Sequence, residues 1–165
     1  MTDGTTTENE PLAQSSARFV DGYLAYLLAQ ASSRISREFH REVEAAGLSV
    51  TEWRVLASLF GSEGESIGTL AQLALTKQPT LSKVVQRMEA DGLVERTGVR
   101  HDRRQTLVRL TRKGRGLGDS LCARALRHQQ AVLEPFGHDN AALLIGMLKD
   151  LIALHPPAAP LADGE

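Results

Sequence analysis

The fold is decided between Gln78 and Leu110, where the chain reads QPTLSKVVQRMEADGLVERTGVRHDRRQTLVRL. The first part of this stretch places apolar residues at the i, i+3, i+4, i+7 spacing of one helix face, namely Leu81, Val84, Val85 and Met88. The opposite face carries hydrogen-bonding and cationic side chains, at Gln78, Thr80, Ser82, Lys83, Gln86 and Arg87. Pro79 falls in the first turn, where a missing N–H costs nothing. Such a polar and cationic face over an apolar one is suited to the major groove of DNA.

After Gly92 the apolar period changes to alternation, which predicts strands at 93–97 and 105–110 joined by a polar loop at 98–104. Cations crowd this hairpin and the residues after it, at Arg96, Arg100, Arg103, Arg104, Arg109, Arg112, Lys113 and Arg115, against only Glu95 and Asp102. Clustered cations repel one another unless a partner neutralises them. We therefore expect the hairpin tip to enter the minor groove of DNA, rather than to be a solvated basic hairpin.

Two more helices are expected before this stretch. Ser49 and Glu52 form a Ser-x-x-Glu capping box, so that one helix should begin near Val50 and run through Leu59. Residues 61–65 are interpreted as a turn. Apolar residues at helical spacing then predict a short helix between this turn and the polar-faced helix; they are Leu70, Ala71 and Ala74.

Long helices are expected on both sides of this region. Residues 19–46 have helical spacing and stop at Gly47, which suits a left-handed helix end. Thr111 can cap a helix that continues to Pro135, and His138 or Asp139 opens a last helix that ends at 155–157. The apolar faces of these helices have no further domain to cover them, which predicts a dimer. The tails, 1–16 and 156–165, are expected to be disordered.

Five short motifs follow one another in a fixed order: GLSxxEWxVL from Gly47, LA from Leu70, MEADGLVER from Met88, DRR from Asp102 and LTxxG from Leu110. Together they resemble the MarR family of transcriptional regulators, closely over 47–117 and in layout over nearly the whole chain. The resemblance implies a mainly α fold with a small β-hairpin wing. This is a winged helix-turn-helix domain with N- and C-terminal dimerisation helices.

The resemblance also implies a division of labour along the chain. Residues 17–48 form the first dimerisation helix, 49–112 the winged DNA-binding domain, and 113–155 the C-terminal dimerisation helices. The expected function is that of a homodimeric, sequence-specific regulator of transcription on double-stranded DNA. We expect a ligand-responsive repressor on a palindromic operator, although the family also contains activators, and the sequence does not choose between them.

Site residues follow from the helix face, the hairpin and the resemblance. The DNA-binding candidates are Gln78, Pro79, Thr80, Ser82, Lys83, Gln86 and Arg87 on the recognition helix, and Arg100, Asp102, Arg103 and Arg104 in the wing. Lys83 and Arg87 are expected at phosphates, because long cations at a groove rim neutralise the backbone. In similar proteins a wing Asp orients a wing Arg, and these roles fall on Asp102 and Arg104.

The same resemblance implies a small aromatic or phenolic acid as effector, bound between the dimerisation helices and the winged domain. The candidate ligand residues are Arg37, Phe39, His40 and Trp53. Trp53 has a second interpretation as a core residue, which a large aromatic on an apolar helix face usually is.

Composition argues against several other classes of protein. The net charge of −1 is near neutral, and no run of about 18 apolar residues is present to span a membrane. The polar start, residues 1–14, lacks the pattern of a signal peptide, and the single Cys122 suits a reducing cytoplasm. We expect Cys122 to be a small buried apolar residue.

No enzyme, cofactor or metal site is expected. The five histidines contain no i, i+4 pair of the kind that holds zinc on a helix. The Gly114-x-Gly116-x-Gly118 run lies early in a predicted helix rather than after a strand, so that it is not a nucleotide-binding fingerprint. The remaining alternative is a winged helix used for protein contacts or for non-specific DNA compaction, which a sequence-preference assay distinguishes.

Overall fold

A computed structural model describes residues 18–99 and 102–156, with side chains at all of these except 99 and 102–105. In chain order the elements are η1 (Phe19–Asp21), α1 (Leu24–Ala45), α2 (Val50–Leu59), β1 (Glu65–Ser66), α3 (Ile67–Leu73), α4 (Gln78–Ala90), β2 (Val94–Val99), β3 (Asp102–Leu110), α5 (Arg112–Leu133), η2 (Glu134–Phe136) and α6 (Gly137–Leu154). The predicted fold class, mainly α with a small β wing, is confirmed. The chain divides into two compact units, and the boundary lies within α1, between Arg37 and Glu38.

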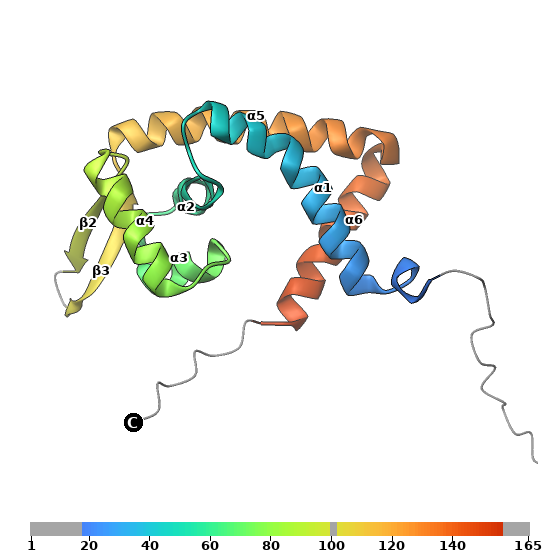
Figure 1. Cartoon of the computed structure of the whole chain (residues 1–165), viewed down its shortest axis with the longest axis horizontal. Coiled ribbons are helices and arrows are strands. Elements are labelled where there is room, and N and C mark those ends of the chain that lie inside the picture. Colours follow the sequence, from blue (N-terminus) through green and yellow to red (C-terminus); the bar gives the residue numbers. More distant parts are fainter. Residues whose placement is uncertain (1–17, 100–101, 157–165) are drawn as a thin grey trace, which may run out of the picture. The chain divides into compact units, whose positions relative to one another are not determined.

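The core of the second unit joins α2, α3, α4 and the sheet at the N-terminal end of α5 (Figure 1). Each of these elements contributes apolar side chains that are fully buried, among them Leu56, Leu59, Leu70, Leu81, Met88, Val94 and Val108. The periodicity of the sequence predicted the buried faces of α2, α3 and α4. Their packing holds α4 with its opposite face toward solvent.

Local capping signals explain where the helices begin. Ser49 and Glu52 form the predicted capping box at the start of α2, and Gly47 has the expected left-handed φ of 78°. Pro79 lies in the first turn of α4. Thr111 caps α5, because its Oγ1 accepts a hydrogen bond from the backbone N–H of Gly114 at 3.0 Å.

The start of α5 is fastened tightly to the turn that connects α4 with β2. Thr111 Oγ1 donates to the carbonyl oxygen of Gly92 at 2.6 Å, and the Thr111 N–H donates to that of Leu93 at 3.1 Å. A Cβ added at Gly114 would overlap the carbonyl group of Leu93. The LTxxG motif therefore has a physical basis: the threonine ties two segments together, and the glycine lets their backbones approach.

The wing differs from its prediction in extent. The strands pair as β1-β3-β2, all antiparallel, and a third strand, β1, pairs with Leu107 and Val108 where the sequence predicted only a turn at 61–65. The predicted loop at 98–104 was wrong, because β2 runs to Val99 and β3 begins at Asp102, with an irregular register at 98/99. Backbone hydrogen bonds extend the ladder through charged positions that break the apolar alternation.

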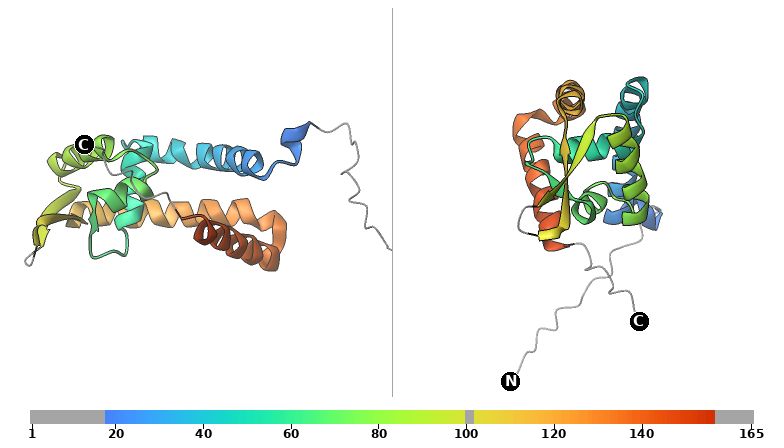
Figure 2. Two further views of the ribbon diagram at one scale, coloured as in Figure 1. Left: turned by 90° about the horizontal axis from the view of Figure 1, so that it is seen from below. Right: turned by 90° about the vertical axis from the view of Figure 1, so that its left-hand side faces the viewer.

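The helix ends also show small differences. The predicted start of the first helix at Phe19 was wrong, because 19–21 form a 3-10 turn and Gly22 separates it from α1. Pro135 lies in η2 directly after α5, as expected, and α6 begins at Gly137, just before the predicted His138 or Asp139. At η2 the chain turns, and α6 runs partly back toward the start of α5 (Figure 2).

Exposed apolar side chains are found on the long helices of both units and on the short segments beside them. In the second unit they include Leu126, Phe136, Leu143, Leu144, Met147, Ile152 and Leu154, and in the first unit Tyr23, Leu24, Tyr26, Leu27 and Ile35. None of the helices within 18–99 and 102–156 has the length and apolar composition needed to cross a bilayer. The expected disorder at 1–16 and 156–165 concerns residues that, except for Pro156, lie outside those that the structure describes.

Candidate nucleic-acid interface

The recognition face of α4 lies open to solvent. All seven candidate residues on this helix are exposed: Gln78, Pro79, Thr80, Ser82, Lys83, Gln86 and Arg87. On the other side of the helix Leu81, Val85 and Met88 are fully buried. The exposure of this face agrees with the sequence pattern, and its contact with DNA stays a prediction.

A hydrogen-bonded turn between α3 and α4 sets the position at which α4 begins. The N–H of Thr76 donates to Ala71 O at 2.9 Å and that of Leu75 to Gln72 O at 3.1 Å, the paired bonds of a Schellman helix end. Leu75 occupies the left-handed position with φ 55° and is 77% exposed. Arg54 of α2 braces the turn by donating to the carbonyl oxygen of Ala74 at 3.2 Å. A leucine gives no sequence signal for such a turn, since glycine normally fills this position.

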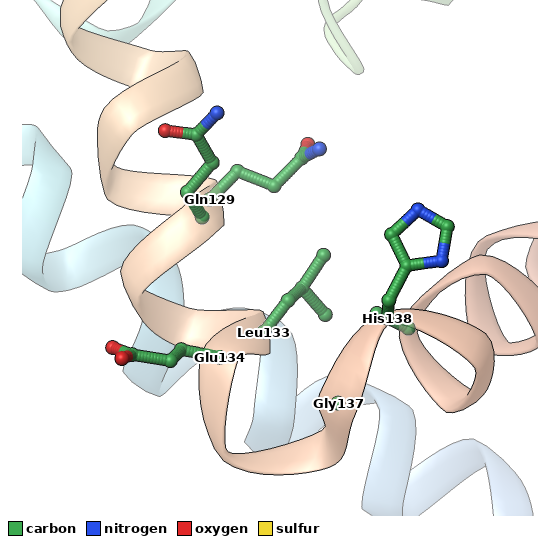
Figure 3. A pocket seen from close by; sticks show the side chains of 7 residues that line it. Gln129, Leu133, Glu134, Gly137 and His138 are labelled. Atoms are coloured by element: carbon green, nitrogen blue, oxygen red, sulfur yellow. The ribbon is translucent and has the colours of Figure 1, made fainter.

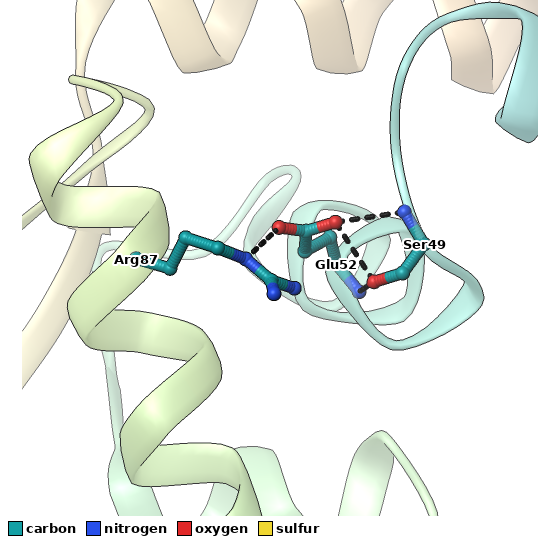
Figure 4. Close-up of polar contacts among 3 residues, drawn as sticks. All are labelled: Ser49, Glu52 and Arg87. Atoms are coloured by element: carbon teal, nitrogen blue, oxygen red, sulfur yellow. Dashed lines mark hydrogen bonds and ion pairs between the residues drawn. The ribbon is translucent and has the colours of Figure 1, made fainter.

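A buried carboxylate joins α2 to the recognition helix (Figure 4). Glu52 is 6% exposed, and its Oε1 accepts a hydrogen bond from Nε of Arg87 at 2.9 Å. Its Oε2 accepts from the backbone N–H of Ser49 at 2.7 Å and from Ser49 Oγ at 2.8 Å. Burial raises the pKa of Glu52, but the bonds from Ser49 and then from Arg87 outweigh it, so that the net shift is downward. The sequence predicted Glu52 as a cap and did not predict its contact with Arg87.

A second ion pair lies at the base of the wing. Arg96 of β2 donates to Oε2 of Glu89, from Nε at 2.8 Å and from Nη2 at 2.5 Å. The hydrogen bond from Arg96 lowers the pKa of Glu89, and the same bond raises the pKa of Arg96. The sequence analysis considered only Glu95 and Asp102 as counter-charges within the basic segment, and it did not predict the pairing of Arg96 with Glu89, which comes from the preceding helix.

The tip of the wing is described only in part. Asp102, Arg103 and Arg104 belong to β3 by their backbone, and their side chains lie outside what the structure describes, as does all of Arg100. The pairing of Asp102 with Arg104 and the four wing contacts with DNA therefore stay predictions.

The candidate ligand residues belong to an aromatic cluster only in part. The ring of Phe39, which is 6% exposed, lies 5.2 Å from that of Trp53 and 5.8 Å from that of His128 between centroids. Trp53 is half-buried against the core, in agreement with its interpretation as a core residue. Arg37 is exposed, and His40 is half-buried.

Sequence reasoning missed His128, which α5 contributes to this cluster. Its position continues the apolar spacing of Leu117, Leu121 and Ala125, which was the available signal. His128 Nε2 lies 3.3 Å from Glu38 Oε2, and Arg124 Nε donates to Glu42 Oε2 at 2.6 Å. These contacts hold α5 against the end of α1 that belongs to the same unit.

An open groove of about 350 Å³ lies elsewhere, at the turn between α5 and α6 (Figure 3). Leu133, Gly137 and His138 are among its lining residues, and none of the four candidate ligand residues is.

Cys122 is half-buried, whereas the sequence predicted a buried residue. Burial raises the pKa of its thiol, and the nearby charge of Asp119 raises it further. In the part of the chain that the structure describes, no cluster of three metal-binding side chains occurs.

A solved structure decides the family. The crystal structure of the MarR family transcriptional regulator SPO1453 from Silicibacter pomeroyi DSS-3 is 41% identical to this chain, with a TM-score of 0.77, and the match covers 85% of this chain and 100% of the other. The chain belongs to the MarR family. The family model described as MarR family matches residues 46–105, which run from the end of α1 into β3.

Of two curated relatives of this chain, one is named as an activator of transcription and the other as a repressor. The transcriptional activatory protein BadR of Rhodopseudomonas palustris is 33% identical over 107 residues, which cover 63% of this chain and 61% of BadR. The HTH-type transcriptional repressor IacR of Pseudomonas putida is 36% identical over 89 residues, which cover 54% of this chain and 53% of IacR. The chain thus matches between half and two thirds of the length of these relatives. All three proteins are named regulators of transcription and not enzymes, in agreement with the prediction from sequence.

Proposed function

We propose that this MarR-family chain is a homodimeric, sequence-specific regulator of transcription that binds a palindromic operator in double-stranded DNA. The observation that carries the proposal is the face of α4, where all seven candidate residues are exposed, six of them polar or cationic, while Leu81, Val85 and Met88 are buried on the other side. A helix held in this way beside a two-stranded wing is the element that enters the major groove in this type of domain.

The distribution of charge supports the same function. A net charge of −1 gives no general attraction to DNA, so that binding depends on where the cations lie. Lys83 and Arg87 are four residues apart on the exposed face of α4, one helical turn from each other. Two cations at this spacing suit neighbouring phosphates at the rim of the groove, while Thr80 and Ser82 suit base edges.

The proposed dimer rests on the apolar faces of the long helices. Leu143, Met147 and Ile152 of α6 are 60–71% exposed, although this helix carries few charges. Contiguous exposed apolar side chains on a helix mark an association surface, and the family resemblance supports a second copy of this chain as the partner. Removal of 139–165 should then give monomer or aggregate. A truncated chain that stays a well-folded dimer by light scattering would contradict this assignment.

The proposed effector is a small aromatic or phenolic acid, and the protein would work in the cytoplasm as a repressor that the acid releases. The proposal is supported by the aromatic cluster of Phe39, Trp53 and His128, whose rings are of the kind against which an aromatic acid stacks. Binding beside the only tryptophan should quench its fluorescence and weaken DNA binding by about 1–3 kcal/mol of coupling. A broad panel of aromatic acids that changes neither quantity would remove this part of the proposal.

The experiment that tests the proposed function is selection from a random-sequence library of duplexes, followed by anisotropy measurements on the enriched sequence. We expect enrichment of an inverted repeat, because a two-fold symmetric dimer reads two equivalent half-sites. A protein of non-specific compaction would instead enrich no sequence and would bind all duplexes alike.

A further inference from the structure

The side chain of Arg87 is exposed to solvent and is also hydrogen-bonded to a buried carboxylate. Its side chain is 59% exposed on the outward face of α4, while its Nε donates to Oε1 of Glu52, a side chain that is 8% exposed on α2. Figure 4 shows the guanidinium reaching across from α4 to the first turn of α2. The two residues are 35 positions apart in the sequence, so the contact depends on the fold and not on one helix.

Glu52 is a fixed point that does not depend on Arg87 for its own position. Two bonds from Ser49, at 2.7 and 2.8 Å, hold Oε2 at the N-terminus of α2, and the N–H of Glu52 returns a bond to Ser49 Oγ at 3.3 Å. The arrangement is a complete capping box, which orders the carboxylate at the start of the helix. Oε1 is left to accept the guanidinium of Arg87.

The chemistry of arginine allows this double use. A guanidinium has five N–H donors in a planar fork, so that a bond from Nε also fixes the direction of the two terminal nitrogens. A lysine has one nitrogen on a flexible stem and could not bond to Glu52 and to a second anion in the same defined geometry. Lys83, one turn earlier on the same face, is such a cation.

We propose that Glu52 is a positioning residue for DNA binding, which orients the guanidinium of Arg87 so that its terminal N–H groups meet a backbone phosphate. The inference rests on the proposed function and adds to it a residue that is itself buried and does not touch DNA. Its physical effect is preorganisation: a side chain already held in its bound geometry loses less freedom when the complex forms, an effect of about two- to tenfold in affinity per side chain.

The test is a double-mutant cycle on the duplex that the parent protein selects from a random library. Glu52→Gln suits this purpose, because glutamine is an accepted capping-box residue and its oxygen can take the bond from Ser49. Its amide N–H₂ then faces Arg87, and two donors cannot bond to each other. The variant therefore releases Arg87 while it preserves the start of α2. The cycle combines Glu52→Gln with Arg87→Ala and, as the matched control on the same helix face, with Lys83→Ala.

The inference predicts that the effect of Glu52→Gln depends on Arg87 alone. We expect Glu52→Gln to weaken binding by about two- to tenfold in the parent and in the Lys83→Ala background, and to have no measurable effect in the Arg87→Ala background. Loss of affinity by the same factor in all three backgrounds, or no loss in the parent, would overturn the inference. If the parent protein enriches no duplex at all, the proposed function fails, and this result is distinct from both.

A second variant tests the inference without disturbing α2. Arg87→Lys keeps the charge, and Ser49 still holds Glu52, so the domain should fold, which circular dichroism checks. We expect weaker binding with an unchanged slope of log affinity against log salt, because the number of neutralised phosphates stays the same while the geometry is lost. Arg87→Lys with the affinity of the parent would contradict the role of the oriented fork.

Discussion

The close approach of α5 to the backbone of Leu93 gives a sharp test of the fold, through the substitution Gly114→Ala. An added Cβ would stand 2.9 Å from the carbonyl carbon of Leu93 and would overlap the oxygen, inside the 3.0 Å that real Cβ atoms essentially never cross. The neighbouring atoms are backbone and cannot swing away as the end of a side chain can. Either α5 or the turn before β2 must therefore move.

The cost of that movement follows from the bonds it disturbs. Overpacking alone costs about 1–3 kcal/mol. The carbonyl of Leu93 accepts from the N–H of Thr111 at 3.1 Å and from its Oγ1 at 3.2 Å, and each weakened bond adds about 0.5–1.5 kcal/mol. Because alanine has a higher helix propensity than glycine, the substitution also stabilises α5 by about 1 kcal/mol, which offsets part of this cost. We expect a net loss of about 1–5 kcal/mol in the free energy of unfolding.

The assay is urea denaturation followed by the fluorescence of Trp53, the only tryptophan, at one protein concentration. The matched control is Gly116→Ala on the same helix, where a Cβ has no neighbour within 4 Å. There alanine should raise the free energy of unfolding by up to about 1 kcal/mol. If Gly114→Ala were as stable as Gly116→Ala, the close approach of α5 to Leu93 would be refuted.

Three further predictions concern the turn, the buried acid and the wing. Leu75→Gly should raise the free energy of unfolding by about 0.5–1 kcal/mol by relieving a left-handed leucine, whereas Leu73→Gly should lower it; urea titration compares them. The pKa of Glu52 is held below its ordinary value of 4.5, so the stability that it contributes is present above that pH and is lost as the pH falls through the folded pKa. The difference in free energy of unfolding between the parent and Glu52→Gln should therefore shrink as the pH falls through the folded pKa of Glu52. Arg104→Ala should stay folded by circular dichroism, bind its operator more weakly at low salt, and reduce the salt slope by about one per wing; unchanged affinity would refute the wing contact.

Local signals account for the parts of the fold that the sequence predicted. The caps at Ser49 and Thr111, the proline in the first turn of α4 and the apolar spacing of Leu81, Val85 and Met88 all act within a few residues. Such signals place the beginning and the buried face of a helix, whatever the rest of the chain does. For this reason the outward face of α4 could be identified in advance.

The parts that escaped prediction depend on partners far away in the chain. β1 has two residues, too few to alternate, and exists only because β3 lies beside it. The ring of His128 reaches Phe39, and Arg87 reaches Glu52 across 35 positions. Leu75 takes a conformation that its own preferences oppose, because bonds on both sides of it and the contact of Arg54 with Ala74 fix the turn. Apart from the spacing that places His128 on the apolar face of α5, the local sequence contains no signal for these contacts.

The central claim, that this chain reads DNA sequence, is tested most directly by one ratio. It is the affinity for the selected duplex divided by the affinity for a shuffled duplex of the same length and composition, measured by anisotropy at the same salt concentration. The recognition face of α4 predicts a ratio of about 10³ or more, as specific regulators show. Equal affinity for the two duplexes would contradict sequence-specific regulation and would leave only phosphate attraction.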